Sequence, residues 1–356
     1  DGAWDVLQTT RVFRDTSAWY HMVFNWDSTL ATSGDRLQIW VNGVRETDFA
    51  DEVQPALNET NNIGAAQAHY INTFGSADYF DGLMSHFHYI DGIAYPASTF
   101  GSTDATTGEW KINTSPTITM GNNGFTILKD GNTITDQSTN SNDWTLGGGT
   151  LTNTEDCPSD VFATLNPLAN YSYPPTLSIG NTKATGAASQ WQLSRGSLGF
   201  SKGKFYWEVK ISGSNVGSNH VGVVDETASN YAGTHGQAGT ITLYNGDGGE
   251  IFTGSDGAFT SANYGDMNGS TDILGVACNF DDGQISYYKN GSIIVTNNAL
   301  DSVTNNKNTL FPLCVMYGSG NIQEYNFGNG YFGTTAITSE GTNASNIGKF
   351  EYDVPT

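Results

Sequence analysis

The acidic side chains closest to a catalytic arrangement lie between Glu46 and Asp51, a stretch that also contains Asp48. A retaining glycosidase needs two carboxyl groups about 5 Å apart, one as acid and one as nucleophile. Here the acids follow the Asn42-Gly43 pair of a hairpin turn, and no continuous strand of alternating apolar residues carries them. We interpret them as the solvated arm of a hairpin, so the pattern predicts no enzyme activity.

Histidines offer a second kind of chemistry. His86 and His88 are separated by one residue, a spacing at which two imidazoles on one strand face could share a metal ion. His21 could join them only if two strands pair. The opposite face of the same strand carries the apolar residues Leu83, Phe87 and Tyr89. We interpret the histidines as a solvent-facing polar pair and predict neither a metal site nor a cofactor.

Composition excludes further classes of protein. Fourteen Lys and Arg residues stand against 36 Asp and Glu, which gives a net charge of -22. A nucleic-acid backbone would meet like charge over most of the surface, so we expect no nucleic-acid partner. No apolar run approaches the roughly 20 residues of a membrane helix, so we expect no membrane insertion. No Gly-x-Ser-x-Gly elbow of a hydrolase precedes a helix.

The elements that must position any site are strands. The 43 glycines and the low share of charged residues, 14%, favour many short strands joined by tight turns, and 356 residues favour two domains. In residues 1–100, alternation places Tyr20, Met22, Phe24 and Trp26 on one strand face and turns Leu37, Ile39 and Val41 inward. Asn42-Gly43 and Asn290-Gly291 are typical of two-residue hairpin turns.

Residues 101–175 are rich in Asn, Thr, Gly and Pro, and we interpret them as a connector with short strands. Regular strands return in 176–335, and 336–356 form a C-terminal extension. In this second domain Phe205, Trp207, Val209 and Ile211 are predicted to face the core, with Tyr206, Glu208 and Lys210 on the polar outer side. Cys278 and Cys314 are predicted to be buried, and Cys157 to be accessible in a loop without a disulfide.

Three motifs of the second domain resemble the SPRY family. They are the strand that begins at Gly203, the hairpin from Leu274 to Gly291, and the closing strand from Tyr325 to Phe332. The resemblance covers some 130 residues and implies an antiparallel β-sandwich that binds its partner through loops. The predicted fold class is therefore all-β, with two antiparallel jelly-roll-like sandwiches joined by a β-rich connector.

The stretches 13–23, 36–43 and 80–85 resemble laminin-G-like domains of the concanavalin-A-like class. The family's first strands are missing, so we expect the first domain to be incomplete at its start and further chain to follow residue 356. Stretches of the connector, such as 100–110 and 156–167, resemble virion proteins of marine-type bacteriophages in which a laminin-G-like module precedes a SPRY module. This resemblance implies a tail fibre or another surface appendage of the virion, and fibre proteins of this kind are commonly trimeric.

The predicted binding surface consists of the SPRY loops 212–220, 225–236 and 244–264. Their aromatic residues stand in Gly-, Ser- and Asn-rich sequence, as in adaptable recognition loops. The candidate contacts are Tyr231, Tyr244, Phe252, Phe259 and Tyr264. The predicted function is non-catalytic adhesion to another virion protein or to a host-surface glycan or receptor. Two alternatives remain, a polysaccharide-active enzyme on the same fold and an architectural spacer without a ligand.

Overall fold

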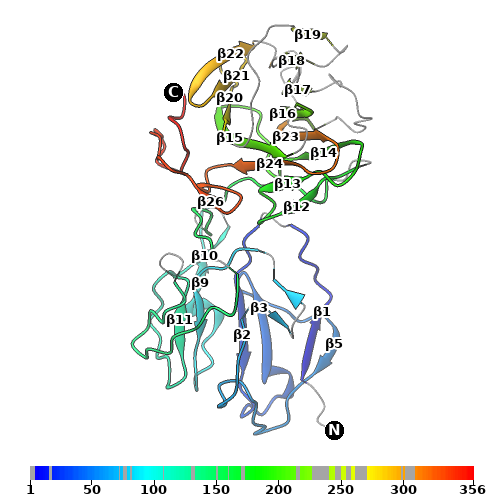
Figure 1. Cartoon of the computed structure of the whole chain (residues 1–356). Coiled ribbons are helices and arrows are strands. Elements are labelled where there is room, and N and C mark those ends of the chain that lie inside the picture. Colours follow the sequence, from blue (N-terminus) through cyan, green and yellow to red (C-terminus); the bar gives the residue numbers. More distant parts are fainter. Residues whose placement is uncertain are drawn as a thin grey trace. The chain divides into compact units, whose positions relative to one another are not determined.

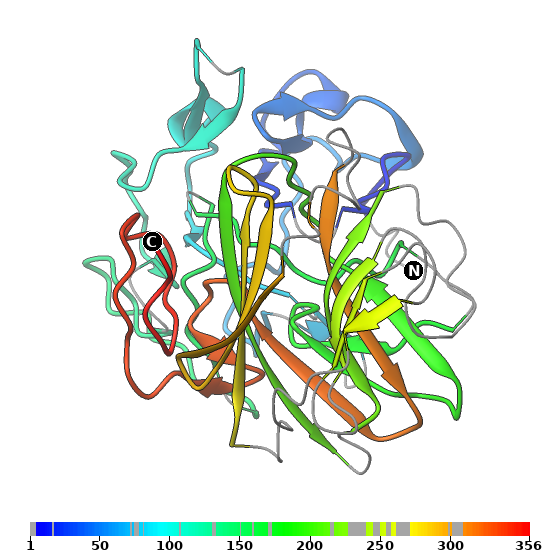
Figure 2. The same cartoon turned by 90° about the horizontal axis from the view of Figure 1, so that it is seen from above.

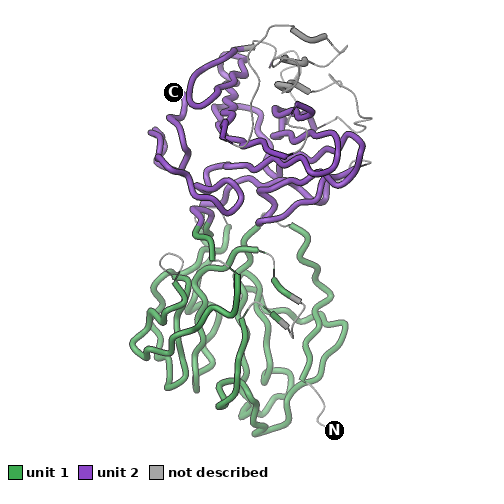
Figure 3. The backbone as a smooth tube through the Cα atoms, in the orientation of Figure 1, with its two compact units in different colours: residues 1–153, 157–159 green, residues 154–156, 160–356 purple. Residues whose placement is uncertain are grey.

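The computed structural model contains two compact units (Figure 3). Unit 1 comprises residues 1–153 and 157–159, and unit 2 comprises residues 154–156 and 160–356. The structure describes residues 5–15, 18–71, 73–74, 78–80, 82–106, 108–129, 133–149, 151–158, 160–169, 173–213, 217–226, 240–244, 250–253, 258–260, 271–297, 300 and 309–356. Among these, the side chains at 74, 78, 240–244, 250–253, 258–260 and 297 are outside the description.

Nearly every described element is a β-strand (Figure 1). Short 3₁₀ turns also occur, such as η1 (Ser33–Asp35) and η2 (Ala97–Thr99). The all-β prediction is confirmed. Within the described ranges no helix has the length and apolar character needed to cross a bilayer.

Unit 1 is built from short antiparallel sheets. One has three strands, in the order β2-β3-β4, and the others are the pairs β1-β5, β6-β7, β8-β11 and β9-β10. The strands are β1 (Val6–Thr9), β2 (Met22–Trp26), β3 (Leu37–Val41), β4 (Val44–Arg45), β5 (Phe49–Val53), β6 (Thr73–Phe74), β7 (Asp78–Tyr79), β8 (Phe87–Tyr89), β9 (Gly101–Thr103), β10 (Trp110–Ile112) and β11 (Phe125–Ile127).

The core of unit 1 forms around Val23, Ala97 and Phe100, with Trp40, Ile90, Tyr95 and Ile118 packed against them. Ile39 and Val41 are buried, as predicted. The buried residue of β2 is Val23, whereas Phe24 is 65% exposed. Both faces of this strand carry apolar residues, so alternation alone does not show which face is covered.

The segment that the sequence analysis interpreted as a connector does not stand apart. Its strand β11 pairs with β8, so that Phe125 lies opposite Tyr89. Phe125 and Ile127 are buried, and Trp144 contacts the Phe125 ring at 5.1 Å between centroids. Residues up to 153 belong to unit 1. Phe125 is buried on a strand of the first hundred residues, and Trp144 packs on Phe125.

Trp110 is a second point at which the 101–153 segment packs on the first hundred residues. A side chain at Gly43 or at Gly101 would overlap the Trp110 ring, so these two glycines allow its close approach. At the tip of the β3–β4 hairpin, Asn42 and Gly43 have φ values of 48° and 75°. The predicted two-residue turn is confirmed, because both residues adopt the positive φ that it requires.

Unit 2 is a sandwich of two antiparallel sheets (Figures 1 and 2). The first sheet has the order β12 (Thr176–Ser178), β13 (Lys183–Thr185), β24 (Asn321–Asn326), β15 (Lys204–Gly213), β20 (Ile273–Asn279), β21 (Gln284–Lys289) and β22 (Ser292–Asn297). The second has the order β14 (Trp191–Arg195), β23 (Leu310–Tyr317), β16 (Asn219–Asp225), β17 (Thr240–Tyr244), β18 (Glu250–Thr253) and β19 (Ala258–Thr260). A short hairpin, β25 (Tyr331–Phe332) and β26 (Thr335–Ala336), follows.

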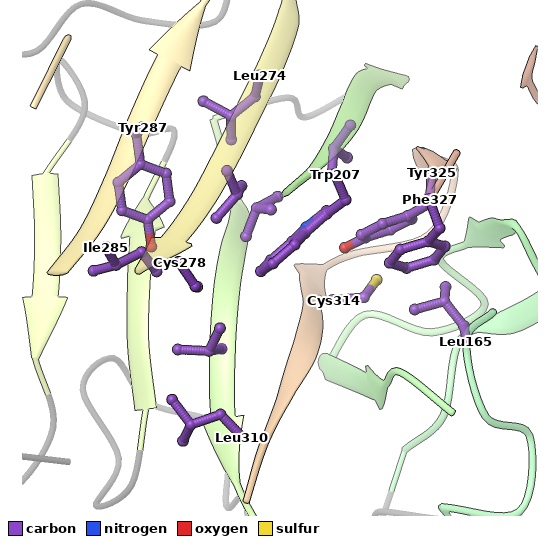
Figure 4. Packing of buried hydrophobic residues seen from close by; sticks show 14 of the residues in the cluster. Leu165, Trp207, Leu274, Cys278, Ile285, Tyr287, Leu310, Cys314, Tyr325 and Phe327 are labelled. Atoms are coloured by element: carbon purple, nitrogen blue, oxygen red, sulfur yellow. The ribbon is translucent and has the colours of Figure 1, made fainter. Parts of the chain in front are cut away.

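The inner faces of the two sheets share one hydrophobic core (Figure 4). Trp207 of β15 and Tyr287 of β21 belong to it, together with Cys278 and Cys314 from opposite sheets. Both thiols are fully buried, as predicted, and burial raises the pKa of each. All three cysteines are free, and Cys157 is half-buried. The protonated, inaccessible state of Cys278 and Cys314 makes them packing residues rather than reactive ones.

The unit also extends beyond the predicted boundaries of 176 and 335. Phe162 and Leu165 are buried in the same core, and Leu165 forms a β-bridge with Gly196. At the other end Phe350 is 6% exposed. These flanking segments belong to unit 2 because each buries a large apolar side chain on the sandwich.

Candidate functional site

Strand directions show where the described strand residues that border the predicted binding loops lie. β16 runs from Asn219 to Asp225, so the connections before and after it leave from opposite ends. Tyr244 of β17 lies opposite His220, which returns the β17–β18 connection to the Asn219 end. Thr253 of β18 lies opposite Ile241, near the Asp225 end. The described residues at the start and the end of β16, which border the predicted loops 212–220 and 225–236, therefore lie at opposite ends of this strand, while residues 214–216 and 227–236 are outside the description.

The five predicted contact residues fall into two groups. Tyr231 and Tyr264 lie outside the described residues. Tyr244, Phe252 and Phe259 belong to β17, β18 and β19, so the interval from 244 to 264 contains strands and is not one continuous loop. Their backbones are paired in register, Phe252 opposite Phe259, while their side chains are outside the description. A contact role for these five residues stays a prediction.

At the Asn219 end of the second sheet the structure brings together Trp191, His220 and Tyr317, which we name the aromatic edge. Trp191 begins β14 and pairs with Tyr317, the last residue of β23. The Trp191 ring centroid lies 5.3 Å from that of Tyr317 and 5.4 Å from that of His220. His220 is buried, and Tyr317 is 38% exposed. The predicted contact Tyr244 lies opposite His220 in the strand register.

The aromatic edge can supply flat apolar rings with polar ends, the arrangement by which Trp and Tyr contact peptides and other ligands at low cost in conformational entropy. Sequence reasoning missed Trp191 and Tyr317 because both stand at strand ends. The sequence shows only that Trp191 begins one strand and that Tyr317 ends another. The pairing of β14 with β23 is what makes the two residues neighbours.

Buried amides hold this end of the sandwich in place. Gln192 is fully buried, accepts a hydrogen bond from Ala187 N at 2.6 Å and donates to Ala188 O at 2.9 Å. Asn321 Nδ2 donates to Tyr317 O at 2.6 Å. The backbone beside the aromatic rings is therefore fixed before any ligand arrives, which reduces the ordering cost of binding.

Gln323 forms a second amide network beneath the aromatic edge. Its Nε2 donates to Asn219 Oδ1 at 2.9 Å and to Val315 O at 2.8 Å, and Tyr325 Oη donates to Gln323 Oε1 at 2.6 Å. Gln323, Asn219 and Tyr325 are fully buried. Because Gln323 belongs to the first sheet and Asn219 to the second, this network ties the two sheets together.

The outer face of β15 differs from the prediction. Glu208 was expected on a polar, solvent-facing side, but it is fully buried. Its carboxylate accepts hydrogen bonds from Glu351 N and Tyr352 N, both at 2.9 Å, and from Tyr206 Oη and Asn326 Nδ2, both at 3.2 Å. Phe350 packs against Tyr206. The correction follows from the C-terminal segment, which covers this face and takes it out of solvent.

The histidines of unit 1 were expected to face solvent, and His88 does not. Its ring stacks against Phe100 at 6.1 Å between centroids, and its Nδ1 lies 2.8 Å from Thr126 Oγ1. His86 has a φ of 51°, so the regular alternation of the strand is broken there. The indole of Trp110 donates to His21 Nδ1 at 3.0 Å. Among the described residues no group of three or more His, Cys, Asp or Glu side chains could hold a metal ion.

Unit 1 should lose stability as the pH falls from 6.5 towards 4. Burial lowers the pKa of His88 to about 4, and the positive charges of His86, Lys129 and His21 act in the same direction. Between the usual value of 6.5 and the lowered one, the unfolded chain binds the proton that the folded unit excludes. Thermal unfolding of the full chain across this range should show the effect, and H88Q should flatten it. An equal pH slope in H88Q would contradict the assignment.

Glu46, the first of the three acids considered for glycosidase chemistry, has a structural partner. It is 8% exposed, and its Oε1 accepts a hydrogen bond from Arg11 Nε at 2.5 Å. Its backbone N donates to Ile39 O at 2.9 Å. Glu46 is therefore held in a structural ion pair with Arg11.

A comparison with known protein families gives one match, and it lies in unit 2. The family model of the SPRY domain matches residues 204–330, from the first residue of β15 to the residue before β25. No curated protein matches the chain.

Several solved structures resemble part of the chain. The SPRY domain of human HERC1 aligns with a TM-score of 0.35 at 16% identity, over 40% of this chain and 87% of that one. The TRIM65 PSpry domain aligns with a TM-score of 0.36 at 16% identity, over 46% and 91%. Stonustoxin aligns with a TM-score of 0.36 at 17% identity, over 46% of this chain and 28% of that chain.

The matched segment contains the three motifs on which the SPRY resemblance rests. SPRY domains are in general non-catalytic modules of protein–protein interaction. The chain contains a SPRY domain, which forms residues 204–330 of its second unit.

Proposed function

We propose that this chain is a non-catalytic adhesion protein of a bacteriophage virion, in a tail fibre or another surface appendage. Its SPRY unit binds a partner protein or a host-surface glycan. The single observation that carries the binding role is the aromatic edge, in which Trp191 and Tyr317 meet beside a turn fixed by buried amides. The net charge of -22 and the scarcity of cations favour a contact made by stacking and neutral hydrogen bonds.

The virion assignment is supported by the resemblance of the connector stretches and of the order of the modules. A laminin-G-like first domain and a trimeric assembly are part of the same proposal. Comparing the adhesion of virions that carry the protein with virions that lack it tests the adhesion role. Equal adhesion of both would leave the chain as an architectural spacer.

Replacing Trp191 or Tyr317 with alanine should weaken ligand binding at least tenfold, about 1.4 kcal/mol, because anchor aromatics dominate binding energies. The measurement is the affinity of the purified full chain for the adhesion target. Tyr70, which is 74% exposed in unit 1, gives the matched control Y70A, expected to bind as the wild type does. Unchanged affinity in both W191A and Y317A would move the site away from the aromatic edge.

A further inference from the structure

β2 lies beside β3 at one edge of the three-stranded sheet of unit 1, where the strand order is β2-β3-β4 (Figure 1). The hydrogen bonds at its two ends show which of its residues face β3. Asn42 N donates to His21 O at 2.9 Å, and Asp27 N donates to Arg36 O at 2.7 Å. Because bonded pairs alternate along an antiparallel ladder, the odd-numbered residues of β2 are the ones that bond to β3.

The even-numbered residues of β2 are Met22, Phe24 and Trp26, and their backbone N–H and C=O groups therefore point away from β3. None of these backbone groups makes a hydrogen bond within the part of the chain that the structure describes. The Phe24 side chain is 65% exposed. The edge of β2 thus offers a row of free backbone donors and acceptors beside an exposed aromatic ring.

This edge also lacks the usual protection against strand pairing. Natural edge strands carry charged residues, prolines or bulges that prevent another strand from adding. No residue of Met22–Trp26 is charged or a proline, and the pairing with β3 has no register shift. By contrast, the edge strand β5 carries Asp51 and Glu52, and the pairing of the edge strand β22 is shifted between Tyr287 and Tyr288. β2 is therefore suited to accept a further strand.

The free groups define the chemistry of the occupant. Donors and acceptors that alternate at the spacing of a strand match another extended main chain. Residues that lie opposite Met22, Phe24 and Trp26 would share the face of these apolar side chains, so apolar residues at alternate positions of the added strand fit best. The net charge of -22 attracts a strand with basic ends and repels a second copy of this chain.

We propose that the edge of β2 binds an extended strand of a partner protein, with apolar residues at alternate positions and basic residues at its ends. We name this edge the strand-addition site. It lies in unit 1 and is separate from the aromatic edge of unit 2, so it goes beyond the proposed function.

The test uses the full chain and a fluorescently labelled peptide in which valine alternates with threonine between two terminal lysines. The peptide should bind, and its binding should slow hydrogen exchange at the amides of Met22, Phe24 and Trp26. The amides of Val23 and Asn25 already bond to β3 and should not change. Two further peptides carry N-methyl groups on all valines or on all threonines. One of them should bind and the other should not, because only one alternating set of N–H groups faces β2.

A pair of variants tests the same edge from the side of the protein. Phe24→Pro removes an N–H that points away from β3, so it should leave the β2–β3 ladder intact and weaken binding at least tenfold. The matched control Phe24→Val keeps this N–H and an apolar strand former, and it should bind within about twofold of the wild type. W191A should bind the peptide as the wild type does, which separates this site from the aromatic edge.

No binding of the peptide, equal binding of the two methylated peptides, or equal affinity of F24V and F24P would overturn the proposal. If F24P does not fold, the methylated peptides decide alone. A dimer of the wild-type chain that F24P abolishes would also overturn it, because the occupant would then be a second copy. A peptide with glutamate in place of both lysines should bind more weakly, and equal affinity would contradict the basic ends of the proposed partner strand.

Discussion

Replacing Trp207 with alanine should lower the free energy of unfolding of unit 2 by about 3–5 kcal/mol. Trp207 is 2% exposed in the core shared by the two sheets (Figure 4). Its ring lies 6.1 Å from that of Phe200 between centroids. Such a loss is a large part of the roughly 5–15 kcal/mol that stabilises a domain. In calorimetry of the full chain, the unit 2 transition should shift strongly or vanish while that of unit 1 stays.

Two further variants test whether lost packing is the reason that W207A destabilises unit 2. W207F keeps an aromatic ring and removes the indole N–H, which is buried and has no acceptor among the described residues, so its cost should be well below that of W207A. F205A lies on the same strand face but at a residue that is 41% exposed, and it should cost less again. A W207A protein that melts within a couple of degrees of the wild type would mean that Trp207 does not hold this core together.

Strand periodicity predicted the packing that depends on local sequence. The alternation of Phe205, Trp207, Val209 and Ile211 identifies the inner side of β15, because successive side chains of a strand point to opposite faces. Three of these four are at most 2% exposed, and Phe205, the second residue of β15, is 41% exposed. A second local signal, the Asn-Gly pair, identified the hairpin turns, since Asn290 and Gly291 also adopt positive φ values of 49° and 77°.

The features of the fold that could not be predicted from the sequence depend on contacts between residues far apart in the chain. Residues 351 and 352, about 140 positions further along the chain, cover Glu208. The sequence around β15 contains no signal that this segment packs on it. β11 pairs with β8 across almost 40 residues, which joined the supposed connector to unit 1. The aromatic edge also could not be predicted, because it too depends on a pairing between distant strands. Trp191 and Tyr317 each look like an ordinary strand end until β14 pairs with β23.

Replacing Glu208 with alanine should cost unit 2 about 3–5 kcal/mol, because each of the four buried donors that lose their acceptor costs about 1 kcal/mol. The change would leave four donors without their acceptor, namely the Glu351 and Tyr352 amides, the Tyr206 hydroxyl and the Asn326 carboxamide. Each buried donor without a partner is destabilising on its own. The C-terminal segment should therefore detach from β15, which hydrogen exchange at the amides of residues 351 and 352 would detect as lost protection.

A matched glutamate on the adjacent strand provides the control. Glu324 of β24 is partly exposed and pairs with Lys183 at 3.2 Å, so E324A should cost no more than about 1 kcal/mol.

The pH dependence of unit 2 stability adds a second readout. Burial raises the pKa of Glu208 above its usual 4.5, despite the hydrogen bonds that favour the charged form. The folded unit therefore holds this proton more tightly than the unfolded chain, and stability should fall as the pH rises from 4.5 through the raised pKa. E208Q cannot titrate and should lose this component of the pH dependence. If E208A unfolds like E324A and keeps the wild-type pH slope, the Glu208 carboxylate does not anchor the C-terminal segment.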